Sequence, residues 1–273
     1  MADTQTVVPR MGLGTFGRTG PEGLAALLDA LEAGYRHLDT AQSYGTEGNV
    51  GAAVRRSGLL RPEVFVTTKI ADTHLDGPRA LESVERSLEA LGLDSVDLLL
   101  IHWPSQGDAV PLEEYLGALA EAQARGWARL IGVSNFTIDH LRRSEAILGP
   151  GRIATNQVEI HPYLQSPKLV GFAREAGLPL TAYQPLAKGR VADDPTLGRM
   201  AAAHGVSPAA VALAFLLAEG HVVIPASSDP GRLRGNLAAL DVALMGEDVA
   251  AIRALDRGQR LINPEKSPNW DDR

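Results

Sequence analysis

The chain of 273 residues is long enough for one large α/β domain or two small ones, and its apolar fraction of 45% is ample for a core. A net charge of −7 argues against electrostatic binding of nucleic acid, and the lack of cysteine excludes disulfides and zinc–thiolate sites. The N-terminal stretch MADTQTVVPR lacks a secretory pattern, and no apolar run reaches the roughly 20 residues that span a bilayer. We therefore expect a cytoplasmic protein that binds neither membrane nor metal, with a monomer as the default.

Short apolar segments of the strand type recur along the whole chain. Several are apolar on both faces, as in DLLLI at 97–101, which is typical of parallel strands covered on both sides. The segments expected to be strands are residues 11–15, 36–39, 64–69, 96–102, 130–134, 155–159, 180–183 and 221–224.

Amphipathic helices are expected between these segments. Leucines at helical spacing within 24–31 and 81–91 are followed by Gly34 and Gly92, which end the helices. Four prolines stand where a first helical residue is expected, three of them after a capping residue. These are Pro111 alone, Pro167 after Ser166, Pro208 after Ser207, and Pro230 after Asp229.

Strands and helices alternate in eight units without a linker or a change in composition. This alternation predicts a parallel sheet, and eight units at this length fit a closed (β/α)8 TIM barrel. Two extra helices are expected, because residues 194–219 hold two, split near Gly205, and 246–256 hold another. The alternative is an open doubly wound sheet, but Gly12, Gly14 and Gly17 do not match the GxGxxG spacing. We predict a single barrel domain over residues 1–273, with a C-terminal tail from about residue 257.

Four polar side chains stand at or just after the ends of three successive predicted strands. Asp39 ends the second strand and Tyr44 follows it, Lys69 ends the third, and His102 ends the fourth. Each alone has an ordinary explanation, such as an aspartate that caps a turn. Because the active sites of such barrels lie at this end of the strands, the four together indicate one site.

The four groups suit protonation of an oxygen that gains negative charge, as in hydride reduction of a carbonyl. A free phenol has a pKa of about 10, too high for easy proton donation at neutral pH. A neighbouring ammonium lowers that pKa, and a carboxylate keeps the ammonium charged. An imidazole can hydrogen-bond the substrate oxygen and align it.

The stretch IPASSDPGR at 224–232 suits a phosphate group. Asp229 and Pro230 mark a helix start, so Ser227 and Ser228 precede the positive end of a helix dipole. Arg232, in the first turn, could bind a ribose 2′-phosphate through two hydrogen bonds. The alternative is an ordinary capped helix with a solvated arginine.

The sequence resembles the aldo-keto reductases over nearly its whole length. The motifs that carry the resemblance are GYRHLDTAQSYGTEGNVG, TTKI, LLIHWP, IGVSNF, NQVEIHPY, AYQPL and IPASSDPGRLRGN. The resemblance implies NADPH-dependent reduction of aldehydes or ketones. In it Tyr44 is the proton donor, Lys69 its activator, Asp39 the partner of Lys69, and His102 orients the carbonyl.

The resemblance also implies a nicotinamide cofactor extended over the barrel mouth. Ser134, Asn135 and Gln157 correspond to residues that hold the carboxamide, and Tyr183 to the ring stacked on the nicotinamide. Ala226 stands where the family usually has lysine, so NADPH is expected to be preferred only modestly and NADH use is possible. The implied cofactor-binding residues are Gly14, Thr15, Asp39, Ser134, Asn135, Gln157, Tyr183, Gln184, Pro185, Leu186, Ala226, Ser227, Ser228, Arg232 and Asn236.

The implied substrate is a small carbonyl compound. The stretches IHWPS and SNFTI and the ending DRGQRLINPEKSPNWD resemble bacterial reductases of 2,5-diketo-D-gluconate and methylglyoxal-like aldehydes. In that resemblance the tail covers the barrel mouth, and Ala71 replaces an aromatic residue and widens the pocket. The implied substrate-binding residues are Phe16, Tyr44, Ala71, His102, Trp103, Arg260 and Trp270.

Two other functions stay open. A Schiff-base lyase would use Lys69 as a neutral amine, although the nearby Asp39 favours the charged form. A cofactor-binding regulatory protein on the same scaffold would have only vestigial turnover, because fold alone does not determine function.

Overall fold

The computed structural model describes residues 8–271. It contains one sheet of eight parallel strands, in which each strand pairs with the next along the chain. The strands are β1 (Leu13–Gly14), β2 (His37–Asp39), β3 (Phe65–Ile70), β4 (Val96–Ile101), β5 (Ala128–Ser134), β6 (Ile153–Glu159), β7 (Leu180–Tyr183) and β8 (Val222–Val223).

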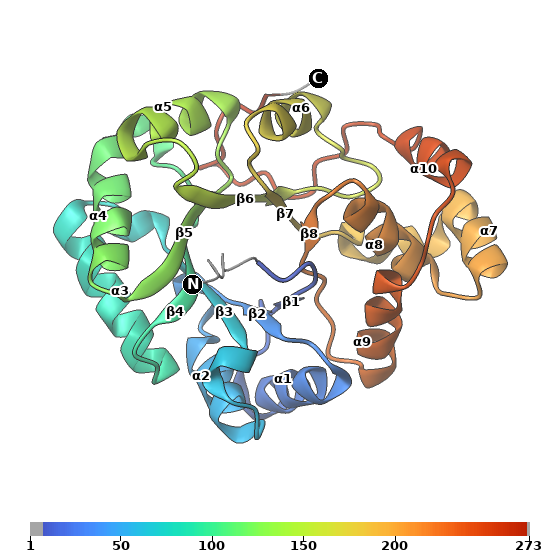
Figure 1. The fold of residues 1–273 in the computed structure, drawn as a ribbon, viewed down its shortest axis with the longest axis horizontal. Helices are drawn as coiled ribbons and strands as arrows, with labels where there is room; N and C mark the ends of the chain where they lie inside the picture. Colours follow the sequence, from blue (N-terminus) through green and yellow to red (C-terminus); the bar gives the residue numbers. More distant parts are fainter. Residues whose placement is uncertain (1–7, 272–273) are drawn as a thin grey trace, which may run out of the picture.

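The two ends of this sheet lie next to each other. Met11 forms a parallel bridge with Val223, and the backbone N–H groups of Gly12 and Gly14 donate to the carbonyls of Val223 and Pro225. The sheet therefore curls on itself, and helices pack around its outer side (Figure 1). This sequential order is consistent with the (β/α)8 fold and differs from that of a doubly wound sheet.

The helices follow the strands as the alternation predicted. They are α1 (Gly20–Ala33), α2 (Glu47–Arg56), α3 (Gly77–Leu91), α4 (Leu112–Ala124), α5 (Ile138–Leu148), α6 (Pro167–Glu175), α7 (Pro195–His204), α8 (Pro208–Ala218), α9 (Pro230–Leu237) and α10 (Gly246–Arg253). Between residues 8 and 271 no single helix is long and apolar enough to cross a membrane. α7 and α8 meet the length and hydropathy requirement only as a pair bent by 90°.

Most predicted helix ends are confirmed. Gly34 and Gly92 follow α1 and α3 in the left-handed conformation, with φ of 114° and 62°. Ser207 caps α8 and Asp229 caps α9, each by accepting a hydrogen bond from a backbone N–H. Gly205 separates α7 from α8, as expected.

Three predicted helix ends were wrong. Pro111 precedes α4 instead of opening it, because its ψ of 140° is extended and not helical. Ser166 makes no capping hydrogen bond, because its φ of 46° is left-handed and not the extended backbone from which a side chain reaches the helix. α10 ends at Arg253, before the predicted residue 256.

Parallel register brings the ends of several strands to one edge of the sheet. Gly14 pairs with Asp39, and Asp39 pairs with Thr67, which precedes Lys69 by two residues. Farther along, Ser134 pairs with Gln157. Residues far apart in the sequence therefore meet at the carboxyl ends of the strands, where the site was predicted.

Candidate active site

A buried ion pair lies at the ends of β2 and β3. Lys69 is fully buried, and its Nζ donates to Oδ1 of Asp39 at 2.5 Å and to the carbonyl of Thr40 at 2.8 Å. Gln157, on β6, donates from Nε2 to the other carboxylate oxygen, Oδ2, at 2.7 Å. Both oxygens of Asp39 are thus hydrogen-bonded, which offsets the cost of burying the two charges.

Tyr44 and His102 lie beside this ion pair. Tyr44 follows β2 in the 3-10 helix η1 (Gln42–Tyr44), and its Oη is 3.4 Å from Nε2 of His102. Nζ of Lys69 is 5.1 Å from the centre of the Tyr44 ring. Asn135 donates from Nδ2 to the carbonyl of His102 at 2.9 Å and so holds that segment. The structure therefore brings the four predicted side chains together.

The pKa of Tyr44 is raised from its usual value, in the direction opposite to the expected one. Burial is the largest cause and raises this pKa, the charge of Lys69 lowers it, and Asp39 raises it further. Burial also lowers the pKa of Lys69, but the charges of Asp39 and Tyr44 outweigh that effect and raise it overall. At neutral pH the pair is therefore a neutral phenol beside an ammonium.

His102 is a neutral imidazole at neutral pH. Burial, followed by the charges of Lys69 and Lys266, holds the pKa of His102 well below its usual value. Its Nδ1 is 3.4 Å from Oγ of Ser43, while Nε2 faces Tyr44. An uncharged ring in this position can hydrogen-bond an oxygen next to the phenol without adding a charge to the site.

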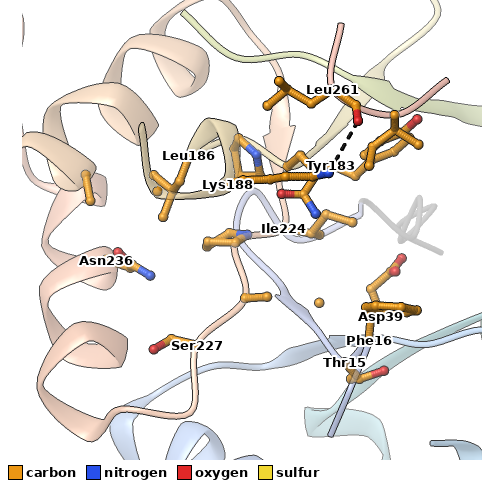
Figure 2. A pocket seen from close by; sticks show the side chains of 18 of the residues that line it. Thr15, Phe16, Asp39, Tyr183, Leu186, Lys188, Ile224, Ser227, Asn236 and Leu261 are labelled. Atoms are coloured by element: carbon orange, nitrogen blue, oxygen red, sulfur yellow. Dashed lines mark hydrogen bonds between the residues drawn. The ribbon is translucent and has the colours of Figure 1, made fainter. Parts of the chain in front are cut away.

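A cavity of about 1440 Å³ lies over these groups. Asp39, Tyr44 and His102 line it, whereas the buried Lys69 does not. Ser227 and Asn236 lie on one side of the cavity, and Thr15 and Asp39 on the other (Figure 2). Among the residues that the structure describes, no group of three or more histidines and acids is placed to hold a metal ion.

Every residue predicted to bind the cofactor lines this one cavity. They lie at or after the ends of β1, β2, β5, β6, β7 and β8, and the sequential order of strands in the curled sheet gathers them. They are Gly14, Thr15, Asp39, Ser134, Asn135, Gln157, Tyr183, Gln184, Pro185, Leu186, Ala226, Ser227, Ser228, Arg232 and Asn236.

The amide-bearing side of the cavity is held by mutual hydrogen bonds. Oγ of Ser134 donates to the carbonyl of Gln157 at 2.8 Å, and Nδ2 of Asn135 donates to Oγ of Ser134 at 3.1 Å. The hydroxyl of Tyr183 donates to Oδ1 of Asn135 at 2.8 Å. Asn135 has a φ of 62°, a strained left-handed conformation that often marks functional sites. These groups form a preorganised polar wall.

The opposite side of the cavity suits phosphate. Oδ1 of Asp229 accepts the backbone N–H of Arg232 at 2.7 Å and opens α9 toward the cavity. Arg232 is mostly exposed, so its guanidinium is accessible. Arg18 also lines the cavity, and its Nε is a buried donor without a hydrogen-bond partner among residues 8–271. Amide groups on one side and the start of α9 with Arg232 on the other fit a dinucleotide cofactor.

The residues predicted to bind substrate are only partly brought together. Phe16 and Trp103 line the cavity, and the Phe16 ring packs edge-on against Tyr44 at 5.2 Å between centres. Ala71 is buried and does not line it. Arg260 and Trp270 line a second cavity of about 200 Å³, with the guanidinium 3.8 Å from the centre of the indole ring. Trp270 still contacts Trp103, at 6.1 Å between ring centres.

Sequence reasoning missed several residues that line the large cavity. Arg18 and Lys188 bring cations to it, and Leu261 and Ile262 bring apolar side chains from the C-terminal tail. Lys188 lies in a turn where it and Ala187 have φ of 54° and 50°. Gly189 was the one local signal for that turn, and no local signal indicated which tail residues reach the cavity.

Known proteins resemble this chain along its length. Residues 10–257 match the model of the aldo/keto reductase family. Methylglyoxal reductase DkgB of Salmonella typhimurium is 45% identical over 265 residues, which cover 97% of this chain and 99% of the relative. A crystal structure assigned provisionally as 2,5-diketo-D-gluconic acid reductase B has a TM-score of 0.92 and 42% identity, covering 97% of this chain and 94% of that one.

A more distant structure has the same fold. The aldose reductase of Schistosoma japonicum superposes with a TM-score of 0.90 and 30% identity, covering 99% of this chain and 98% of that one. Matches of this length and identity include all of the strands that carry the site. The chain therefore belongs to the aldo/keto reductase family, oxidoreductases that act on small carbonyl compounds and use nicotinamide cofactors.

Proposed function

We propose that this protein reduces small aldehydes and ketones to alcohols with NADPH, and that Tyr44 is the proton donor. One observation carries the proposal. Tyr44 and His102 face the same large cavity as the amide groups after β5 and β6 and the cationic start of α9. Proton donation and cofactor binding can therefore take place in one enclosed volume.

NADPH, when bound, supplies the hydride. Tyr44 donates its hydroxyl proton to the carbonyl oxygen while that oxygen gains negative charge. The ammonium of Lys69 stabilises the phenolate that remains, and Asp39 holds that ammonium through a hydrogen bond of 2.5 Å. Neutral His102 hydrogen-bonds the same oxygen and aligns it with the phenol.

The polar wall would hold the cofactor by its carboxamide. Ser134, Asn135 and Gln157 offer hydroxyl and amide groups at the carboxamide, and the ring of Tyr183 offers a stacking surface. Ser227 and Arg232 would bind phosphate at the other end. Ala226 supplies no cation there, so we propose that NADPH binds more tightly than NADH by only a modest factor.

The substrate is proposed to be a small carbonyl compound of the methylglyoxal or 2,5-diketo-D-gluconate type. The names of the relatives support this class. Phe16 and Trp103 would form its walls. Arg260, Trp270 and Ala71 do not line the cavity and would affect the substrate indirectly. Trp270 would do so through its contact with Trp103.

We further propose one closed barrel domain in which α7 and α10 are the two additions. His204 of α7 and Asp248 of α10 lie 3.2 Å apart, so these helices support each other. The tail from residue 257 would cover the barrel mouth, although residues 272 and 273 lie outside the described part. A cytoplasmic monomer remains our working proposal.

A lyase reaction through Lys69 is disfavoured. Such a reaction needs a neutral amine, whereas Asp39 and Tyr44 raise the pKa of Lys69 against the lowering effect of burial. No contact of the described residues favours the regulatory alternative over turnover.

The test compares wild type with Tyr44→Phe. Purified protein is assayed with NADPH and NADH against 2,5-diketo-D-gluconate, methylglyoxal and an aromatic aldehyde. We expect Tyr44→Phe to lower the rate by about 10²–10⁴-fold, the usual loss for a proton donor, with cofactor affinity unchanged. Tyr115→Phe, at a buried tyrosine of α4 that does not line the cavity, is the control and should keep full activity.

Two results would contradict the proposal. An undiminished rate in Tyr44→Phe would exclude Tyr44 as the proton donor. Tight cofactor binding by wild type without turnover of any carbonyl would favour the regulatory alternative.

A further inference from the structure

The carboxylate of Glu159 is buried near the cavity and has no part in the reaction proposed above. Glu159 ends β6 and is only 1% exposed. Its Oε1 accepts the backbone N–H of Leu261 at 2.7 Å, and its Oε2 accepts the N–H of Ile262 at 2.9 Å. One buried side chain therefore binds two consecutive peptide groups of the C-terminal tail.

A third donor comes from His161. The backbone N–H of Tyr163 donates to Nδ1 of His161 at 3.3 Å, so Nδ1 is an acceptor and Nε2 carries the hydrogen. Nε2 lies 3.1 Å from Oε1 of Glu159 and donates to it. Three N–H donors surround the carboxylate, and these hydrogen bonds compensate its loss of water.

The two tail residues bound by Glu159 form part of the cavity wall. Leu261 and Ile262 both line the cavity. The carbonyl of Leu261 accepts a hydrogen bond of 3.3 Å from Nζ of Lys188, which lies in the loop after β7 (Figure 2). The tail is thus held on one side by β6 and on the other by the loop after β7.

β6 also holds the catalytic ion pair. Gln157 and Glu159 are two residues apart, so their side chains leave the strand on the same face. Gln157 donates to Asp39, while Glu159 accepts from the tail. One strand therefore sets the position of the tail relative to the predicted proton donor and its partners.

Beyond this anchor the tail reaches the loops on the substrate side. Lys266 pairs with Asp72 after β3, and Gln106 after β4 donates to the carbonyl of Glu265. Trp270 contacts Trp103. These three contacts involve Asp72, Gln106 and Trp103, and none of them involves the segment after β8 that is proposed to bind phosphate. Among the described residues, the anchor therefore concerns the substrate end of the cavity.

We propose that Glu159 is a positioning residue that fixes residues 259–271 over the cavity and thereby sets the KM for the carbonyl substrate. Only the expected change in KM rests on the proposed function. The binding of the tail by Glu159 can be measured without any activity.

The test uses Glu159→Gln in the full-length protein. Glutamine keeps the shape of the side chain but has a single acceptor oxygen. Its NH2 group is a donor and cannot accept the second backbone N–H of the tail. We expect amide exchange in residues 259–271 to accelerate by about ten- to hundredfold, the effect of leaving one buried N–H donor without its acceptor. KM for the carbonyl should rise by about tenfold, with kcat and cofactor affinity within about twofold of wild type.

Asp97→Asn is the matched control. Asp97 is also a buried carboxylate with a backbone donor, the N–H of Val66 at 2.9 Å, but it lies near the start of β4. This substitution should lower thermal stability and leave both tail exchange and KM unchanged. A merely destabilising role of Glu159 would give the same pattern as this control.

Either of two outcomes overturns the proposal: unchanged tail exchange in a folded Glu159→Gln protein, or accelerated exchange with unchanged KM. If Glu159→Gln does not fold, Leu261→Pro removes one N–H donor and keeps the carboxylate, and it must then raise both tail exchange and KM. Wild-type protein without any turnover would refute the proposed function, while the exchange result would still decide whether Glu159 holds the tail.

Discussion

At Tyr44, burial and charge shift the pKa in opposite directions. Burial raises the pKa most, the ammonium of Lys69 lowers it, and the carboxylate of Asp39 raises it. The net shift is upward, so the phenol stays protonated at neutral pH. The proposed proton donor needs that form, and in the proposed mechanism Lys69 limits the rise and stabilises the phenolate left after donation.

Opposite shifts of the pH–rate profile are expected for two substitutions at this residue cluster. Donation requires the protonated phenol, so kcat/KM should hold below the pKa of Tyr44 and fall as pH rises through it. Lys69→Met removes the charge that lowers this pKa and should move the fall to higher pH. Asp39→Asn removes a charge that raises the pKa and should move the fall to lower pH.

Measurement of kcat/KM against pH for the three proteins checks this expectation. Both variants should also have a lower kcat, and each leaves one buried charge without its partner, which costs about 3–5 kcal/mol of stability. Circular dichroism at each pH is therefore the control for folding. A fall at the same pH in all three proteins would mean that another group titrates.

For single residues, the sequence predicted which side chains form the candidate site but not how deeply each one is buried. Asp39, Tyr44, Lys69 and His102 could be picked out because each stands at or shortly after the end of a predicted strand. The direction of the pKa shift of Tyr44 could not, because it depends on how much protein covers the phenol. Glu159 stands within the motif NQVEIHPY, but its partners in the tail are more than a hundred residues away in the sequence.

At the scale of elements, the pattern of apolar runs located all eight strands. β7 has the predicted bounds, and β5 and β6 each begin two residues earlier than predicted. In β5 the missed start includes the exposed Arg129, whereas the missed start of β6, Ile153 and Ala154, is apolar but only half-buried. Hydrogen bonds to neighbouring strands extend an element beyond its apolar run, and those bonds cannot be seen in a local pattern.

The start of α9 determines the expected cofactor preference. Fluorescence-quenching titration of wild type should give NADPH a modestly lower Kd than NADH, because Arg232 is accessible and Ala226 supplies no charge. Ala226→Lys adds a cation beside the predicted phosphate site. It should strengthen NADPH binding by about tenfold, which corresponds to about 1.4 kcal/mol, and leave NADH binding unchanged.

The comparison of the two cofactors contains its own control. NADH lacks the 2′-phosphate, so a general effect of the new lysine would change both affinities alike. Equal affinities of wild type for NADPH and NADH would contradict the assigned phosphate site. Strengthening of both by Ala226→Lys would place the new charge near the shared part of the cofactor.

At the scale of the whole molecule, strict alternation of strands and helices was enough to predict a sequential parallel sheet, because a parallel connection requires a crossover. The path of the tail could not be predicted in the same way. Arg260 and Trp270 lie at the smaller cavity, while Leu261 and Ile262 reach the larger one. Long-range contacts of an irregular segment leave no periodic pattern in the sequence.

Helix α8 offers a test of whether stability and activity can be changed separately in this molecule. All residues from Ala210 to Leu217 are buried, so the helix is apolar on every side and belongs to the core. Leu213 is fully buried and does not line the large cavity. Leu213→Ala should therefore cost about 2–5 kcal/mol and lower Tm by roughly 5–15 °C, through lost burial and the hole left behind.

Leu60→Ala is the matched control, because it makes the same change at a leucine that is 72% exposed. Thermal unfolding of both variants, with steady-state kinetics at 25 °C, checks the expectation. Leu60→Ala should leave Tm within about 2 °C of wild type, since little apolar surface is involved. Both proteins should keep wild-type kcat and KM while folded, because neither residue touches the site. A loss of kcat in Leu213→Ala well below its Tm would mean that core packing around α8 is coupled to the geometry of the active site.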